Sequence, residues 1–257
     1  MHLEEFYVRS RDGVAIQCFA HGCGEPVLLV HGLQRCADIW FPLIGLLPGN
    51  FRYVMPNLRG RGGSGCPDDP ESYLLERFVD DAEAVVMEMD QPVSILGWSM
   101  GASVGWGLSG RSVASRVARW IFVSGSPDSV NSRRLFPDLT PADLQRAVGR
   151  RVPADGMVNV CSVDVAISAW KGFRDVDFLT APPVLNAPSL IIHGDKDRDC
   201  PVDAVVDLAR LTGSELVRFE GAGHSPMKDE PELFVKVVSE FLLRSARCTS
   251  VESCASA

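Results

Sequence analysis

The chain has 257 residues, of which 46% are hydrophobic and 23% are charged, and its formal net charge is −8. These proportions exclude a disordered or fibrous chain, and the length suffices for a sizeable hydrophobic core. The negative charge argues against a nucleic-acid partner, because binding to a phosphate backbone depends on clustered lysine and arginine.

The sequence contains no signal for insertion into a membrane or for secretion. Uninterrupted apolar runs stay well short of the roughly 18–20 residues that a membrane span needs. The chain starts with acidic residues within positions 1–5, whereas a signal peptide starts basic and continues apolar. None of the eight cysteines forms a Cys-x-x-Cys pair, and we expect them to be reduced. We therefore predict a cytoplasmic protein with no membrane partner.

The pattern of residues 5–108 predicts a hairpin followed by alternating strands and helices. Residues 5–10 and 14–20 have β character and flank an Asp-Gly pair that is typical of a tight turn. Residues 26–30 form a short apolar run, as in a strand covered on both faces. The expected elements then alternate, with strands at 51–55 and 93–96 and helices at 37–47, 71–89 and 100–108. This alternation predicts an α/β fold.

The remaining strands are expected at 120–123, 189–193 and 215–219, followed by a closing helix at 231–243 with Leu233, Val237, Val238 and Phe241 on one face. Between residues 125 and 188 no strand is expected, and helices are expected from Thr140-Pro141 and over 157–170. We interpret this segment as a helical cap. The predicted organisation is a core of residues 1–125 and 188–244, a cap insertion of residues 126–187 and a flexible tail of residues 245–257.

Ligands of open α/β sheets bind at the carboxyl ends of the strands, so the residues that follow each strand are informative. The strand at 93–96 is followed by Gly97-Trp98-Ser99-Met100-Gly101 and then a helix. This is the Gly-x-Ser-x-Gly nucleophile elbow in its strand-turn-helix setting. The glycines allow a sharp turn, which strains the backbone of Ser99 and exposes its hydroxyl. Ser99 is the candidate nucleophile.

A serine hydroxyl needs a base within hydrogen-bond reach, and the chain has five histidines. His2 lies at the terminus and His21 in a hairpin. His31 and His193 each end a strand before a glycine, where a hydrogen bond to nearby backbone is expected. His224 lies in a loop of small residues after the last strand and is the candidate general base.

Three aspartates, Asp195, Asp197 and Asp199, follow the strand at 189–193 and could orient the base. Together with the elbow, this segment resembles the α/β-hydrolase superfamily, in particular its cap-bearing serine esterase branch, over residues 5–243. In that family the acid occupies the fourth place of a Gly-x-x-Asp pattern, which implies Asp197. Asp128, after the preceding core strand, is the alternative, because some relatives place their acid there.

An oxyanion hole needs preorganised N–H donors. One donor follows from the elbow, namely the backbone N–H of Met100 at the start of a helix. The resemblance implies Leu33, after His31-Gly32, as the other. The residues expected to line the substrate pocket are His31, Gly32, Trp98 and Trp170. We expect neither a cofactor nor a metal ion.

The segment Gly60–Gly65 satisfies Gly-x-Gly-x-x-Gly, a fingerprint of dinucleotide-binding sites. Its context argues against such a site, because the glycines do not open a helix. The same residues resemble the Asp-x-x-Gly-x-Gly-x-Ser loop of α/β-hydrolases, with Asn57 in place of the aspartate and one extra glycine. Ser99 at the elbow argues against the dehalogenases and epoxide hydrolases of that superfamily, which use aspartate.

These residues predict a serine hydrolase that cleaves a small or medium carboxylic ester, or a thioester, through an acyl-enzyme. The alternative is an acyltransferase or thioesterase that acts on an acyl group bound to an acyl carrier protein. Such an acidic partner would dock on the arginines of the cap, for which a solvated helix face is the simpler interpretation. The arginines are Arg133, Arg134, Arg146, Arg150 and Arg151. A perhydrolase activity and a non-catalytic binding protein remain open as well.

Overall fold

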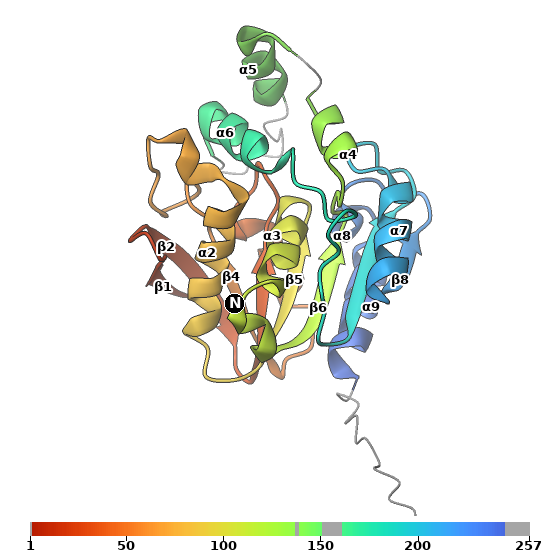
Figure 1. Cartoon of the computed structure of the whole chain (residues 1–257). Coiled ribbons are helices and arrows are strands. Elements are labelled where there is room, and N and C mark those ends of the chain that lie inside the picture. The colour runs from red at the N-terminus through yellow and green to blue at the C-terminus, as the bar shows by residue number, and fades with distance from the viewer. Residues whose placement is uncertain (1, 137–138, 151–160, 245–257) are drawn as a thin grey trace, which may run out of the picture.

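A computed structural model describes residues 2–136, 139–150 and 161–244 of the chain. Eight strands form one sheet (Figure 1). In spatial order they are β1 (Glu4–Arg9), β2 (Ala15–Gly22), β4 (Phe51–Pro56), β3 (Glu25–Val30), β5 (Val93–Trp98), β6 (Val117–Val123), β7 (Ser189–Gly194) and β8 (Glu215–Phe219). β2 pairs antiparallel with both β1 and β4, and the other pairs are parallel. The expected α/β fold with an N-terminal antiparallel hairpin is confirmed.

Helices connect the strands and cover both faces of the sheet. The α-helices are α1 (Phe41–Ile44), α2 (Leu75–Met87), α3 (Met100–Ser109), α4 (Ser129–Arg134), α5 (Pro141–Arg150), α6 (Val163–Phe173), α7 (Val202–Thr212), α8 (Pro226–Asp229) and α9 (Pro231–Leu243). Short 3-10 helices are η1 (Ala37–Trp40), η2 (Pro70–Tyr73) and η3 (Ser112–Arg116).

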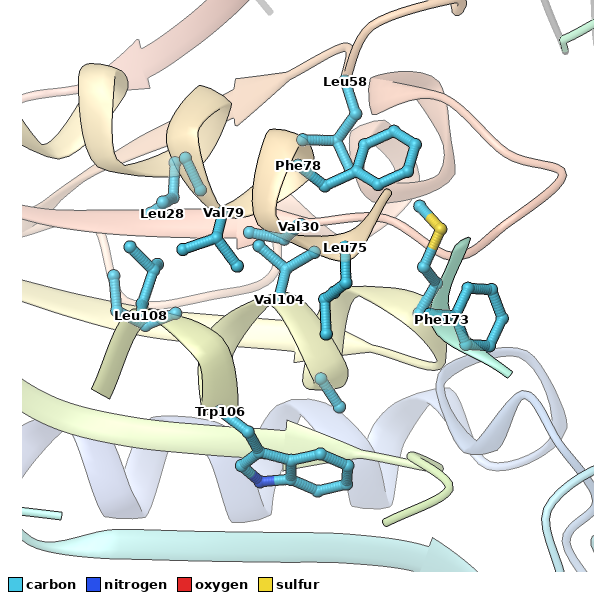
Figure 2. Packing of buried hydrophobic residues seen from close by; sticks show 14 of the residues in the cluster. Leu28, Val30, Leu58, Leu75, Phe78, Val79, Val104, Trp106, Leu108 and Phe173 are labelled. Carbon is cyan, nitrogen blue, oxygen red and sulfur yellow. The ribbon is translucent and has the colours of Figure 1, made fainter. Parts of the chain in front are cut away.

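The central strands bury both faces, and alternate residues enter two separate cores. On one side, Leu28 and Val30 of β3 pack in a cluster with residues of α2, α3 and α7. Figure 2 shows this packing, in which Val79 of α2 lies close to Val104 of α3. On the other side, residues of η1, α1, α8 and α9 pack against the intervening strand residues. The sheet is thus packed on both faces.

Several predicted helices differ from the observed ones. The helix expected at 71–89 is divided into η2 and α2, because Leu74 has an extended backbone (ψ 152°). On α9 the prediction grouped Leu233 with Val238 and Phe241 on one apolar face, but Leu233 is 41% exposed. The buried residues of α9 are Phe234, Val238, Phe241 and Leu242. Helix α7 was not predicted. These differences depend on how each helix meets the sheet, which local spacing does not determine.

The segment between β6 and β7 carries α4, α5 and α6, which Figure 1 shows together at one end of the molecule. α5 begins at Pro141 as expected, and the Thr140 hydroxyl accepts a hydrogen bond from the Asp143 amide. α6 begins at Val163, because the Ser162 side chain caps it by accepting from the Val165 amide. The helix expected over 157–170 therefore starts later, and its residues 157–160 lie outside the described residues. The division into a core and a cap stays a prediction, and the predicted tail at 245–257 also lies outside the described part.

A buried ion pair fixes the glycine-rich loop after β4. The Arg59 side chain is fully buried, and its guanidinium donates to the carboxylate of Asp81 at 2.6 Å and to that of Asp12 at 2.7 Å. Asp81 belongs to α2 and Asp12 to the β1–β2 turn, so the pair ties three segments together. Residues 66–69 after the loop form no helix, and the next element is η2, so the loop does not open a helix as a dinucleotide site would.

Asp81→Asn is expected to lower the free energy of unfolding by about 3 kcal/mol, because it removes the fully buried one of the two carboxylates that pair with the Arg59 guanidinium. Equilibrium unfolding in urea measures this loss. The control is Asp207→Asn, which breaks an exposed pair with Arg210 (3.4 Å) and should cost at most about 1 kcal/mol. Equal losses in the two variants would contradict the structural role of the buried pair.

Across the described residues, every helix is too short or too polar to cross a membrane.

Candidate active site

Ser99 lies in a sharp turn between β5 and α3. Its backbone has φ 57°, a region that non-glycine residues rarely adopt. The turn is possible because Gly97 and Gly101 have no side chains. A Cβ atom on Gly97 would collide with the backbone of Gly101, and one on Gly101 would collide with the backbone of Val30. The sequence therefore produces the strained elbow that its pattern predicts.

Ser99, His224 and Asp197 form a continuous hydrogen-bonded chain at the carboxyl edge of the sheet. The Ser99 Oγ lies 2.9 Å from His224 Nε2, and His224 Nδ1 lies 2.9 Å from Asp197 Oδ2. The carboxylate can only accept, so Nδ1 carries the proton and Nε2 is left to accept from the Ser99 hydroxyl. This tautomer is the one that a general base toward Ser99 requires.

Several contacts hold the imidazole of His224 in place. The Trp98 indole Nε1 donates to the His224 carbonyl at 2.8 Å. The centroids of the Trp98 and His224 rings lie 5.6 Å apart. The Gly223 amide donates to the Asp229 carboxylate at 2.7 Å. The elbow and the loop of His224 are thereby joined directly, although 125 residues separate Ser99 from His224.

The Asp197 carboxylate is buried and receives several hydrogen bonds. Its Oδ1 accepts from the amides of Asp199 and Cys200, each at 2.9 Å. Burial raises the pKa of Asp197, but hydrogen bonds from His193 and His224 outweigh burial and hold that pKa well below its ordinary value. The group is therefore a carboxylate over the whole physiological pH range and can stabilise an imidazolium at His224.

The other aspartates serve other contacts. Asp128 is the N-cap of α4, and its side chain accepts from the Asn131 amide at 2.7 Å. Asp195 accepts from the Gly221 amide at 2.7 Å and so supports the loop before His224. Among the described residues, the carboxylate that contacts His224 is that of Asp197.

The loop that carries Leu33 packs directly on the elbow. A Cβ atom on Gly32 would lie 3.2 Å from the Cβ of Ser99 and 3.2 Å from the Trp98 ring, so glycine permits this approach. The Leu33 amide donates no hydrogen bond within the loops of the described part. Met100 opens α3, and the first amide of a helix has no acceptor within that helix. Both N–H groups are thus available to a ligand near Ser99.

His31 orients the peptide that carries the Leu33 amide. The Leu58 amide donates to His31 Nε2 at 3.1 Å, so the ring proton is on Nδ1, which donates to the Gly32 carbonyl at 2.8 Å. In a trans peptide the N–H points away from the carbonyl, so holding the Gly32 oxygen also aims the Leu33 N–H. His193 likewise donates from Nε2 to the Cys200 carbonyl, at 2.6 Å. The expected backbone contacts of both histidines are present.

A hollow of about 340 Å³ lies beside Ser99 and His224, close to the lower end of the range for ligand pockets. Gly32, Leu33 and Trp98 line it, as expected for Gly32 and Trp98. Further lining residues that the sequence analysis did not identify are Gln34, Arg35, Leu135, Asp199, Cys200 and Ser225. Gln34 and Arg35 could have been found, because they directly follow Leu33, the expected oxyanion donor.

Two of the expected pocket residues are not in the lining. His31 is completely buried beneath the loop. Trp170 is 3% exposed, its indole donates to the Ser132 carbonyl at 2.9 Å, and its ring packs on Phe136. The prediction that His31 and Trp170 line the pocket is therefore wrong, because both rings fill space inside the protein.

Four of the five arginines predicted to bind a carrier protein belong to α4 and α5. Arg133 pairs with Asp175 at 2.7 Å, and Arg146 pairs with Asp143. Arg134 ends α4 and is exposed. The side chain of Arg150 and the whole of Arg151 lie outside the described residues.

Asp197, Cys200 and His224 have possible metal-ligand atoms within 4.8 Å of one another. The carboxylate of Asp197 and the imidazole of His224 are hydrogen-bonded to each other in this structure.

A stability prediction follows from the burial of His31. Burial, together with the charge of Arg61, lowers the pKa of His31 to about 3 from its ordinary value of 6.5. The unfolded chain therefore binds a proton that the folded chain does not, and His31 lowers the stability as pH falls from 6.5 towards 3. The limiting slope is about 1.4 kcal/mol per pH unit.

His31→Asn removes this titration but keeps a donor for the Gly32 carbonyl. We expect its unfolding free energy to depend less steeply on pH between 6 and 4 than that of the wild type, as measured by urea titrations at several pH values. Parallel pH profiles of the two proteins would contradict a buried neutral imidazole at this position.

Comparisons with known proteins agree with this architecture. A model of the alpha/beta hydrolase family matches residues 27–237. The AB hydrolase superfamily protein YisY of Bacillus subtilis is 25% identical, over 91% of this chain and 98% of that protein. The pimeloyl-[acyl-carrier protein] methyl ester esterase of Aromatoleum aromaticum is 27% identical, over 80% of this chain and 93% of that protein. The structure of an esterase from Exiguobacterium antarcticum superposes with a TM-score of 0.78 at 22% identity, covering 93% and 99% of the two chains, and this likeness concerns the fold.

Proposed function

Because the chain belongs to the alpha/beta hydrolase family, we propose that it is a serine hydrolase that cleaves a small carboxylic ester or thioester through an acyl-enzyme. The observation that supports this proposal most strongly is the position of His224, whose two ring nitrogens each lie 2.9 Å from their partners, the Ser99 hydroxyl and the Asp197 carboxylate. That arrangement activates a hydroxyl for attack on a carbonyl carbon.

In the proposed mechanism, His224 Nε2 takes the proton of Ser99 as its Oγ attacks the carbonyl carbon. The oxyanion of the tetrahedral intermediate accepts hydrogen bonds from the backbone amides of Leu33 and Met100, and Asp197 stabilises the imidazolium. The bond to the leaving alcohol or thiol then breaks, and His224 returns the proton to it. Water, deprotonated by His224, attacks the acyl-enzyme, and the carboxylic acid leaves as Ser99 regains its proton.

The substrate that fits the proposal is a small molecule. The hollow of about 340 Å³ suits a short or medium acyl group, and polar side chains, Gln34, Arg35 and Asp199, occur in its lining. Turnover of p-nitrophenyl esters of increasing chain length tests the proposal. We expect hydrolysis of the short esters and a decline for acyl chains that exceed the hollow. Lack of turnover of every ester in the series would overturn the proposal that the protein is an ester hydrolase.

The second candidate is action on an acyl group held by a carrier protein. It is favoured by similarity to the pimeloyl-[acyl-carrier protein] methyl ester esterase and by the arginines on α4 and α5. The pairing of Arg133 and Arg146 with carboxylates of this chain weakens it, because paired arginines attract an acidic partner less.

Comparing kcat/KM for an aryl ester with that for an acyl-carrier thioester separates the two candidates. Docking on the arginines predicts that Arg134→Glu lowers kcat/KM only with the carrier substrate, and that added salt does the same. Unchanged, salt-insensitive carrier turnover in this variant would exclude docking there and leave the free ester as the substrate.

A further inference from the structure

Arg61 is a buried arginine in the loop between β4 and η2. Its side chain is only 1% exposed. One terminal nitrogen donates to the Arg59 carbonyl at 2.8 Å, and the other donates to the Leu33 carbonyl at 2.7 Å. The guanidinium lies over the ring of Phe78, 5.2 Å from the ring centroid, and Phe78 is one of the residues drawn in Figure 2.

The surroundings of Arg61 differ from those of its neighbour Arg59. Arg59 is paired with two carboxylates, whereas within the described part of the chain no carboxylate pairs with Arg61 and its Nε has no hydrogen-bond partner. An unpaired buried charge opposes folding, and an apolar side chain would often be more stable in its place. Arg61 is therefore not expected to stabilise the folded protein, and its role must be sought in the group that it holds.

That group is the carbonyl of Leu33, whose amide is a proposed oxyanion donor. The Leu33 carbonyl belongs to the peptide that follows Leu33, and it also accepts a weak contact from the Cys161 thiol at 3.7 Å. The preceding peptide is held through the Gly32 carbonyl, by the His31 ring at 2.8 Å and the Arg35 amide at 3.3 Å. Peptide planes on both sides of the Leu33 Cα are thus anchored, and this fixes the direction of its N–H.

The charge of Arg61 acts on the same loop. After burial, it is the next cause of the low pKa of His31, so it helps keep that ring neutral. A protonated His31 could no longer accept from the Leu58 amide, and the orientation of the Gly32 carbonyl would lose this support. Arg61 therefore supports the loop in two ways, by donating to the Leu33 carbonyl and by favouring the neutral form of His31.

We infer that Arg61 is a positioning residue, which aims the Leu33 N–H at the oxyanion by holding the Leu33 carbonyl. The inference rests on the proposed function, in which this N–H stabilises the tetrahedral intermediate. Because the donor is a main-chain group, substitution at Leu33 cannot remove it, and Arg61 is the side chain through which its role can be tested.

Arg61→Met tests the inference, because Met fills similar space without donors or charge. We expect kcat for a p-nitrophenyl ester to fall about 10²-fold, the effect of a small misplacement of a reacting group, with KM nearly unchanged. Binding of a boronic acid, which becomes tetrahedral on Ser99, should weaken by a similar factor. Arg61→Lys keeps the charge and one donor and should recover part of kcat.

The matched control is Arg119→Met. Arg119 is 8% exposed and also donates to a main-chain carbonyl, that of Arg244 at 2.7 Å, but it lies near the amino end of β6, away from Ser99. This variant should keep wild-type kcat per folded molecule. Stoichiometric labelling with a fluorophosphonate gives the number of folded sites and corrects every rate.

The outcomes are distinct. A wild type that neither reacts with the probe nor turns over esters overturns the proposed function and the inference with it. An active wild type whose Arg61→Met and Arg61→Lys variants keep kcat and boronic-acid affinity per folded site overturns the inference alone. A selective loss of kcat and boronic-acid affinity, partly recovered by lysine, supports it.

Discussion

Ser99→Ala is expected to lower kcat for ester hydrolysis by about 10⁴- to 10⁶-fold while leaving the fold intact. The hydroxyl is the atom that attacks in the proposed mechanism, and no other described hydroxyl is hydrogen-bonded to His224. Alanine keeps the Cβ atom, so it adopts the unusual φ of 57° about as well as serine does. The measurement is single-turnover and steady-state release of p-nitrophenol, with thermal unfolding as the check on folding.

The control for this variant is Ser109→Ala, at the far end of α3. In the described part of the chain the Ser109 hydroxyl donates to the Trp106 carbonyl at 2.7 Å, and its loss should leave kcat close to the wild-type value. A Ser99→Ala protein that retains a tenth or more of wild-type turnover would show that hydrolysis takes place without Ser99 as nucleophile.

Asp197→Asn is the second large effect, with an expected loss of about 10⁴-fold in kcat. An asparagine amide can donate to His224 Nδ1, which moves the ring proton to Nε2, and that nitrogen then cannot accept from Ser99. The side chain keeps its shape and its oxygen can still accept from the Cys200 amide, so we expect little change in the backbone. The rate at pH 7–8 with a saturating aryl ester measures the loss.

The alternative acid provides the matched control. Asp128→Asn should preserve turnover, because asparagine caps a helix as well as aspartate does and Asp128 contacts Asn131. If Asp128→Asn abolished turnover and Asp197→Asn did not, the assignment of the acid would have to be reversed.

The sequence predicted the sheet and the junctions at its edge, because both depend on local signals. Short apolar runs that end at glycine mark buried parallel strands, and the Gly-x-Ser-x-Gly pattern specifies a turn whose strain is observed at Ser99. The contact between Ser99 and His224 was predictable because the loops that follow the parallel strands of this fold lie at one edge of the sheet.

Other features depend on contacts between distant segments and could not be predicted. Trp170 was expected in the pocket, but its indole finds an acceptor at Ser132, 38 residues away, and its ring completes a core. Arg61 was considered only as part of a glycine-rich motif, and its contact with Leu33 becomes visible only in three dimensions. Hydrophobic spacing identifies a buried side chain but not the segment that covers it.

The most direct test of the account is the site of covalent labelling by a fluorophosphonate probe, determined by peptide mass spectrometry. We predict one adduct per chain, located on Ser99, absent in Ser99→Ala and strongly slowed in Asp197→Asn. An unlabelled wild-type protein, or an adduct on another residue that persists in Ser99→Ala, would contradict a hydrolase built on Ser99, His224 and Asp197.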